Sequence, residues 1–129
     1  MTLRVVLSNT SGEPIYAQIA EQVKAAILSG DLAEGDLLPS IRGLARDLRV
    51  SVITTTRAYS DLAAAGFITN VPGKGSYVLP RDSELVREAL LREVEDLLAE
   101  AARKADVAGL DRAELHTVLD TILDTPEEA

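Results

Sequence analysis

The feature that most constrains the fold is a series of apolar stripes at helical spacing, each bounded by residues that start or stop helices. The first stripe extends from Ile15 to Ile27 and follows Glu13-Pro14, where proline suits the first helical position. Gly30 comes just after this stripe and predicts the end of the helix. The pattern favours a helix over a strand at the start of the chain.

Two further helices and a hairpin are predicted next. Ser40 is a good N-cap for a second helix and Ser51 for a third, with a tight turn at residues 49–50 between them. Two short β-type runs, residues 67–71 and 76–79, follow the third helix and are separated by a Pro-Gly-Lys-Gly sequence. The predicted order is therefore helix, helix, tight turn, helix, hairpin.

The remainder of the chain predicts a pair of longer helices. Ser83 is placed to cap the first, Gly109 to break it, and Asp111 with Glu114 to form a capping box for the second. Such broad apolar stripes exceed what one small neighbour covers, which predicts a two-helix homodimer interface, with packing inside one chain as the alternative. The expected dimer contacts are Leu85, Ala89, Leu90, Val94, Leu97, Leu98, Leu115, Leu119 and Ile122.

The formal net charge of −8 is distributed unevenly. Residues 1–80 contain seven Lys/Arg and seven Asp/Glu, whereas residues 81–129 contain six Lys/Arg and fourteen Asp/Glu. Within the first part, the sixteen residues from Arg42 to Arg57 include four arginines and a single acid, Asp47. This asymmetry indicates two modules with different partners, residues 1–80 and residues 81–129, and on charge alone an ordinary solvated surface is an equally good interpretation.

The predicted order of elements is that of a winged helix-turn-helix, whose second helix enters the major groove of DNA. The expected inner face of that helix comprises Thr55, Ala58, Tyr59 and Leu62. Steps of about 100° per residue then place Ile53, Thr56 and Arg57 on the opposite side. Arg57 suits a phosphate or a guanine edge, while Ile53 has two alternatives: a thymine methyl group or packing against the preceding helix.

Two flanking features suit phosphate contacts. Ser51 stands at a helix N-terminus, where its hydroxyl and the free backbone N–H groups are able to hold an anion. In the predicted wing, Gly73 and Gly75 allow close approach of the backbone to DNA, and Lys74 adds a positive charge. Taken alone, the wing sequence is equally typical of an ordinary hairpin turn.

Six blocks of the sequence, in order, resemble the N-terminal DNA-binding domain of the GntR family. They are Pro14–Ile19, Ile27–Leu32, Leu38–Arg42, Val50–Ser51 with Arg57–Tyr59, Leu62 with Gly66–Ile68, and Gly73–Val78. Residues 81–129 are similar to the short C-terminal module of the YtrA-like branch of that family. The resemblance is strong because the blocks follow one another at matching intervals.

The resemblance implies a mainly α fold with a small β wing, in which a winged helix-turn-helix domain (1–80) precedes a two-helix dimerisation module (81–129). It implies a homodimer, expected to be a repressor, that binds a pseudo-palindromic operator in double-stranded DNA and controls a transporter operon. A cytoplasmic location is expected separately, because the sequence has no apolar run of membrane-spanning length and no signal peptide. Whether a small-molecule effector binds is left open. The residues carried over as DNA contacts are Ser40, Arg42, Ser51, Ile53, Thr56, Arg57, Gly73, Lys74 and Gly75.

The sequence departs from the family pattern at three positions. Many members carry Arg where this chain has Val52, Glu where it has Gly43, and a basic residue where it has Thr56. Gly43 removes the capping-box partner of Ser40, so the second helix is expected to begin less firmly. The other two departures reduce the positive contacts and bear on operator sequence and affinity.

Other classes of protein have less support in the sequence. With no cysteine and the single His116, expected to be a surface residue, the chain offers no thiolate metal site and no Ser-His or Cys-His catalytic pair. No cofactor, metal or catalytic residue is therefore predicted, and no membrane span or signal peptide. The alternatives are a protein-interaction adaptor whose winged helix no longer binds DNA and, with less support, a carboxylate enzyme.

Overall fold

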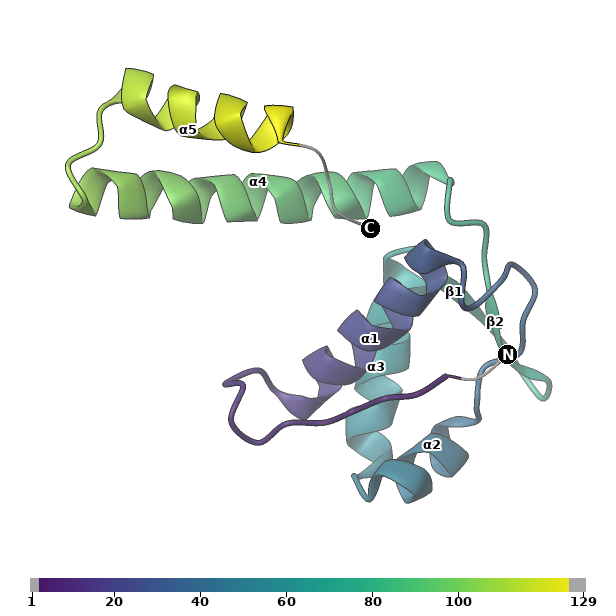
Figure 1. Ribbon diagram of the computed structural model, residues 1–129. Helices are drawn as coiled ribbons and strands as arrows, with labels where there is room; N and C mark the ends of the chain where they lie inside the picture. The colour runs from purple at the N-terminus through teal and green to yellow at the C-terminus, as the bar shows by residue number, and fades with distance from the viewer. Residues whose placement is uncertain (1–2, 126–129) are drawn as a thin grey trace. The chain divides into compact units, whose positions relative to one another are not determined.

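The computed structural model describes residues 3–125, within which five helices accompany one two-stranded antiparallel sheet (Figure 1). This confirms a mainly α fold with a small β wing. The chain divides into two compact units, residues 1–89 and 90–129. The two units meet after Ala89, whereas the composition of the sequence changes at Pro80. The boundaries differ because the first residues of the long helix pack with the first unit. Val86 is buried there, and Leu85 lies against Gly66.

The first helix, α1 (Ile15–Ser29), forms because its apolar residues fall on one face. Ile19, Val23 and Ile27 on that face are buried. Pro14 is the N-cap residue and not the first helical residue as expected, since its carbonyl already accepts the bond from the N–H of Gln18, at 3.1 Å. Gly30 ends the helix in the left-handed conformation, with φ 89°.

The helix-turn-helix consists of α2 (Ile41–Leu48) and α3 (Val52–Ala64). The turn between them depends on Arg49, whose φ of 59° makes it the one described non-glycine residue with a left-handed backbone. Tyr59 of α3 is buried, and its hydroxyl donates a hydrogen bond of 2.7 Å to the carbonyl oxygen of Pro39. This bond joins α3 to the segment that leads into α2.

The wing is a hairpin of β1 (Ile68–Val71) and β2 (Gly75–Val78), paired antiparallel from Ile68–Val78 to Val71–Gly75. Gly73 at its tip and Gly75 beside it have φ values of 76° and 117°, which only glycine adopts readily. Leu37 forms an isolated bridge to Tyr77, so the hairpin is attached to the loop before α2.

The N-terminal segment runs in extended form along α1 (Figure 1) and is fastened to it by two glutamines. The side-chain amide of Gln22 accepts a bond from the N–H of Val6, at 2.8 Å, and donates one to its carbonyl oxygen, at 2.7 Å. Gln18 does the same at Ser8, with both distances 2.8 Å. Each amide thus pairs with the chain as a neighbouring strand would.

The long helix α4 (Glu84–Val107) and the last helix α5 (Arg112–Asp124) form a helical hairpin. The N–H of Val86 bonds to the hydroxyl of Ser83 at the start of α4, and Gly109 allows the chain to reverse with φ 77° (Figure 1). Asp111 and Glu114 form the expected capping box. None of the described residues of α5 is buried.

Candidate nucleic-acid interface

The outer face of α3 is exposed where the sequence predicts it to be. Thr55, Ala58, Tyr59 and Leu62 are buried, which confirms the inner face. On the opposite side Thr56 and Arg57 are exposed, and the side chain of Ile53 is 82% exposed. The packing alternative for Ile53 is therefore wrong. A large apolar side chain with this exposure is available to a partner from outside the unit.

The N-terminus of α3 is capped by Ser51 and points away from the core. The hydroxyl oxygen of Ser51 accepts a bond of 3.0 Å from the N–H of Thr54 and donates one of 2.8 Å to the hydroxyl of Thr54. Because the Ser51 hydroxyl is already engaged in capping, the free donors for an anion are the first backbone N–H groups of the helix. Ser51 itself is exposed beside them.

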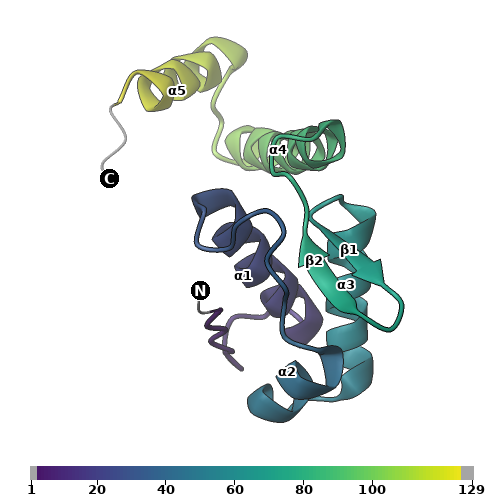
Figure 2. The same ribbon diagram turned by 90° about the vertical axis from the view of Figure 1, so that its right-hand side faces the viewer.

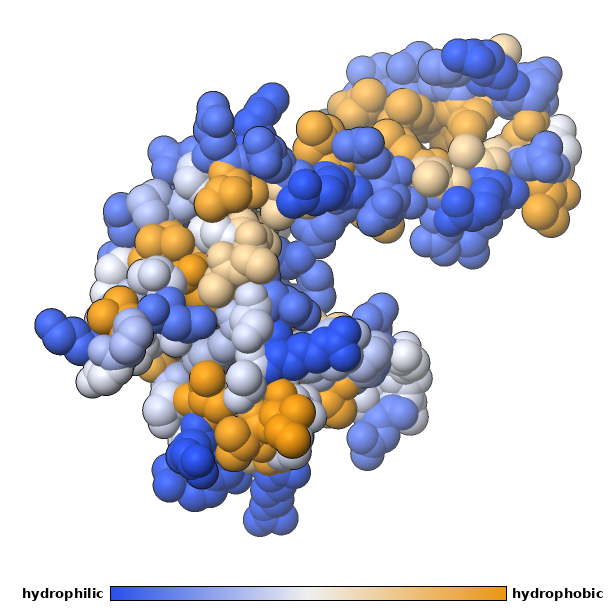
Figure 3. Space-filling model, turned by 180° about the vertical axis from the view of Figure 1, so that it is seen from behind, coloured by the Kyte–Doolittle hydropathy of each residue, from blue (hydrophilic) through white to orange (hydrophobic). Residues whose placement is uncertain are grey.

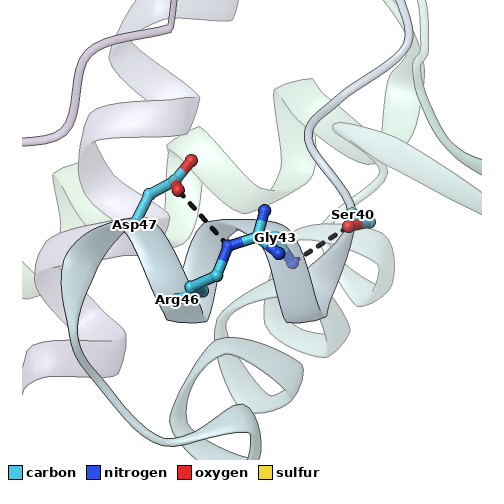
Figure 4. A network of polar contacts seen from close by, with 4 residues as sticks. All are labelled: Ser40, Gly43, Arg46 and Asp47. Atoms are coloured by element: carbon cyan, nitrogen blue, oxygen red, sulfur yellow. Dashed lines mark hydrogen bonds and ion pairs between the residues drawn. The ribbon is translucent and has the colours of Figure 1, made fainter.

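The start of α2 carries a half-complete cap (Figure 4). The N–H of Gly43 donates a bond of 3.0 Å to the hydroxyl oxygen of Ser40, and the reciprocal side-chain bond of a capping box is missing, as expected. Arg42 is exposed next to this cap. One turn later, the Nε atom of Arg46 lies 3.8 Å from a carboxylate oxygen of Asp47, an exposed pair that offsets part of the local positive charge.

The wing tip presents backbone and a single cation. Gly73, Lys74 and Gly75 are all exposed. A side chain added at Gly73 would meet nothing within 4 Å, whereas one at Gly75 would come 2.9 Å from Leu37. The positive φ at both positions requires glycine, and Gly73 leaves the tip open for an approaching surface.

Figures 1 and 2 show α2 and the N-terminal end of α3 together at one end of the first unit. The fold thus brings Ser40, Arg42 and Ser51 to that end, with Ile53, Thr56 and Arg57 along the exposed side of α3. The turn between β1 and β2, which forms the wing tip, projects to one side of α3 (Figure 2). The arrangement offers a protruding helix with free backbone donors at its tip and cations on either side of it.

One residue of this surface escaped the sequence analysis. The guanidinium carbon of Arg57 lies 3.7 Å from the centroid of the Tyr16 ring, so that α1 contributes a side chain to the exposed face of α3. The only signal in the sequence was that Tyr16 belongs to the first of the six blocks. Helical spacing relates residues within one helix and gives no indication of a pairing between α1 and α3.

The expected dimer residues fall into two groups. Leu85 and Ala89 belong to the first unit, where Leu85 lies against Gly66. In the second unit Leu90, Leu115 and Leu119 are half-buried, while Val94, Leu97, Leu98 and Ile122 are exposed. Figure 3 shows apolar side chains gathered along this hairpin. The hairpin alone leaves much of its apolar stripe in contact with solvent.

Burial raises the pKa of the Tyr59 phenol well above its ordinary value, and that group serves the helix-turn-helix packing. No cluster of three His, Asp or Glu suited to a metal occurs among residues 3–125, and His116 is exposed. Within the same described range, no helix has the length and apolar character needed to cross a membrane.

Comparison with known proteins shows which family shares this sequence and this arrangement of elements. Residues 15–78 match the family described as "Bacterial regulatory proteins, gntR family". The chain is 32% identical over 106 residues to the HTH-type transcriptional repressor YtrA of Bacillus subtilis (strain 168), an alignment that covers 82% of each chain.

Solved structures agree with the fold. A transcriptional antiterminator from Listeria monocytogenes EGD-e superimposes with a TM-score of 0.71 at 28% identity, covering 95% of this chain and 96% of that one. The DNA-binding domain of AraR, solved in complex with operator ORX1, superimposes with a TM-score of 0.53 at 27% identity, covering 60% of this chain and 98% of that one. These relatives and folds are those of transcription regulators and not of enzymes.

Proposed function

Because the chain belongs to the GntR family of bacterial regulatory proteins, with a YtrA-like repressor among its relatives, we propose that it is a repressor that binds a pseudo-palindromic operator as a homodimer. The observation that carries the proposal is the exposed face of α3. It presents Ile53, 82% exposed, at the N-terminal end of the helix with its free backbone donors, and Thr56 and Arg57 about one turn further along.

The proposed contacts divide by their chemistry. Arg42, Arg57 and Lys74 are exposed cations suited to phosphates, and the N-terminus of α3 beyond Ser51 is a further phosphate site. Ile53 and Thr56 lie where the major groove presents base edges and thymine methyl groups. Ser40 caps α2, and Gly73 and Gly75 shape the turn of the wing, so their part in binding is to position backbone against DNA.

Dimerisation is supported by the apolar stripe of the second unit. Leu97 and Ile122 are 66% and 64% exposed in the single chain, and a second copy would cover them. Two linked reading domains would then bind two half-sites jointly, which raises affinity through effective concentration. The setting proposed for this activity is the cytoplasm, and the genes controlled are proposed to be a transporter operon that includes the repressor's own gene.

The test is footprinting with the full chain on the DNA upstream of its own gene, followed by a gel shift titrated with salt. We expect a protected site with two related half-sites and an affinity that falls steeply as salt rises. The double variant Arg57→Ala with Lys74→Ala should lose most of that occupancy. Arg92→Gln in α4 is the control that changes net charge away from the proposed surface.

Two outcomes would contradict the proposal. A chain that gives no specific complex at any salt concentration would instead be an interaction adaptor with a winged helix. A chain that binds the site while the Arg57/Lys74 double variant binds equally well would have its DNA-binding surface elsewhere.

A further inference from the structure

The exposed arginine of α3 is held by an aromatic ring from another helix. Arg57 lies in the middle of α3, and its guanidinium carbon is 3.7 Å from the centroid of the Tyr16 ring. That distance is typical of a guanidinium stacked flat on the ring. Among the residues that the structure describes, Arg57 forms no ion pair, so the ring is the contact that orients it.

Stacking leaves the binding capacity of the arginine intact. A guanidinium has five N–H donors, all directed outward in its plane, and a ring beneath the plane uses none of them. An unsupported arginine would have to give up side-chain rotamer freedom on reaching DNA. An arginine already fixed in its plane by Tyr16 gives up less of that freedom.

The ring itself is firmly placed. Tyr16 is half-buried in the first turn of α1, two residues after the N-cap Pro14. Next in the same turn, Gln18 is buried, and its amide bonds to Ser8 and to the carbonyl oxygen of Glu13. These bonds hold the first turn of α1 against the N-terminal segment and against the residue that precedes Pro14. In the described part of the chain, the hydroxyl of Tyr16 has no hydrogen-bond partner, so its ring and not its hydroxyl makes the contact.

We infer that Tyr16 is a positioning residue for DNA recognition: its ring holds the guanidinium of Arg57 in the orientation in which it meets a phosphate or base edge. The inference rests on the proposed function. It adds a residue from outside the helix-turn-helix to the binding machinery. It also assigns the ring, and not the hydroxyl, as the part that matters.

The first measurement needs no DNA. In the NMR spectrum of the free full chain, a ring stacked on Arg57 should shift the signals of its side chain upfield. Tyr16→Phe keeps the ring and should keep the shift, whereas Tyr16→Leu should remove it. If Tyr16→Leu leaves the Arg57 signals unchanged, the stack is absent in solution and the inference fails, whatever the protein binds.

The second measurement is operator affinity, using the duplex DNA identified by footprinting. Because the stack is already present in the free chain, the gain on binding is the ordering of the arginine side chain that is avoided, about 0.5–1.5 kcal/mol, which is about two- to tenfold per half-site and about five- to hundredfold for a dimer. Tyr16→Leu should weaken binding by that factor, and Tyr16→Phe should bind within about twofold of the wild type. Thermal unfolding of both variants shows whether each remains folded at the binding temperature.

A double-mutant cycle separates positioning from general structure. In the background of Arg57→Gln, Tyr16→Leu should have no further effect on affinity, because the group it positions is gone. Arg92→Gln is the matched control background, in which Tyr16→Leu should keep its full effect.

Each contrary result has a distinct meaning. If Phe is as damaging as Leu, the hydroxyl touches DNA and the positioning role is wrong. If Leu remains as damaging without Arg57, Tyr16 acts through the fold and the positioning role is again wrong. If the wild type itself binds no specific DNA, the proposed function fails together with the positioning role, even where the NMR shift confirms the stack.

Discussion

At the scale of single residues, the hydroxyl of Tyr59 links the two helices of the helix-turn-helix. It is buried with its ring and donates to the carbonyl oxygen of Pro39, immediately before the N-cap Ser40 of α2. A buried phenol without a partner would be costly, and the carbonyl supplies that partner. The bond therefore contributes to the angle at which α3 leaves the core as well as to stability.

Replacing Tyr59 with Phe should lower the free energy of unfolding by about 1 kcal/mol, because the ring remains packed while the hydrogen bond is lost. Urea unfolding at neutral pH measures the change. Tyr77→Phe is the control, since its hydroxyl reaches the carbonyl oxygen of Lys74 over 3.3 Å in an exposed position. Equal losses in the two variants would show that the Tyr59 bond has no special weight.

A substitution at Ile53 should affect DNA binding without affecting the stability of the fold. Because its side chain is 82% exposed, Ile53→Ala should change the free energy of unfolding by less than about 0.5 kcal/mol. Loss of an apolar base contact should weaken operator binding by about tenfold. Gel shifts beside urea unfolding test both. A clear loss of stability with unchanged DNA binding would make Ile53 part of the fold.

At the scale of elements, periodicity and caps predicted the helices well because both are local. The stripe of α1, the serine caps of α2 and α3, and the capping box of α5 each depend on residues within one or two turns. The one shift, at the start of α1, arises because Pro14 fits the N-cap as well as the first helical position. Local rules decide such features without knowledge of the packing.

The features that local rules missed all join separate elements. Neither the stack of Arg57 on Tyr16 nor the pairing of Gln22 with Val6 leaves a periodic signal, since each brings together segments whose separation is set by the tertiary fold. The exposure of Ile53 was undecided for the same reason: its angle on α3 was predictable, but the absence of a neighbour was not. The sequence thus predicted the residues of the candidate surface, but it did not predict the contacts from other elements that hold them in place.

The N-terminal segment gives an element-scale test. Gln22→Leu removes both bonds to Val6 and should increase amide hydrogen exchange of residues 5–8, with little effect on α1 itself. Gln22→Glu is the matched comparison, because a carboxylate still accepts from the N–H of Val6 but no longer donates. We expect intermediate exchange for Glu. Unchanged exchange in Gln22→Leu would show that the glutamine does not hold the segment.

At the scale of the whole molecule, the two parts of the chain differ in net charge and in how many of their residues are buried. The first unit has its own core, and residues 1–80 within it have equal numbers of acidic and basic residues, whereas residues 81–129 carry the net charge of −8. A helical hairpin with no buried residue in α5 is a poor independent unit. Its stability in solution is therefore expected to depend on self-association, and with it the spacing of two reading domains.

If the proposed dimer forms, Leu97→Lys and Ile122→Lys should each convert it to monomer, because a charge placed in an apolar twofold interface is introduced twice and loses its hydration. Sedimentation at several concentrations measures the change. Val107→Lys is the matched control: Val107 is 89% exposed, more than either target, yet lies at the end of α4 on another face of the helix. It should remain dimeric, which distinguishes loss of a specific interface from loss of any exposed apolar group.

Monomeric variants should retain the fold of the first unit, visible in the NMR signals of its core, but bind the operator far more weakly, since two half-sites are no longer held by linked domains. If both lysine variants stay dimeric, the hairpin is not the interface, and the exposed stripe of α4 and α5 must serve another partner.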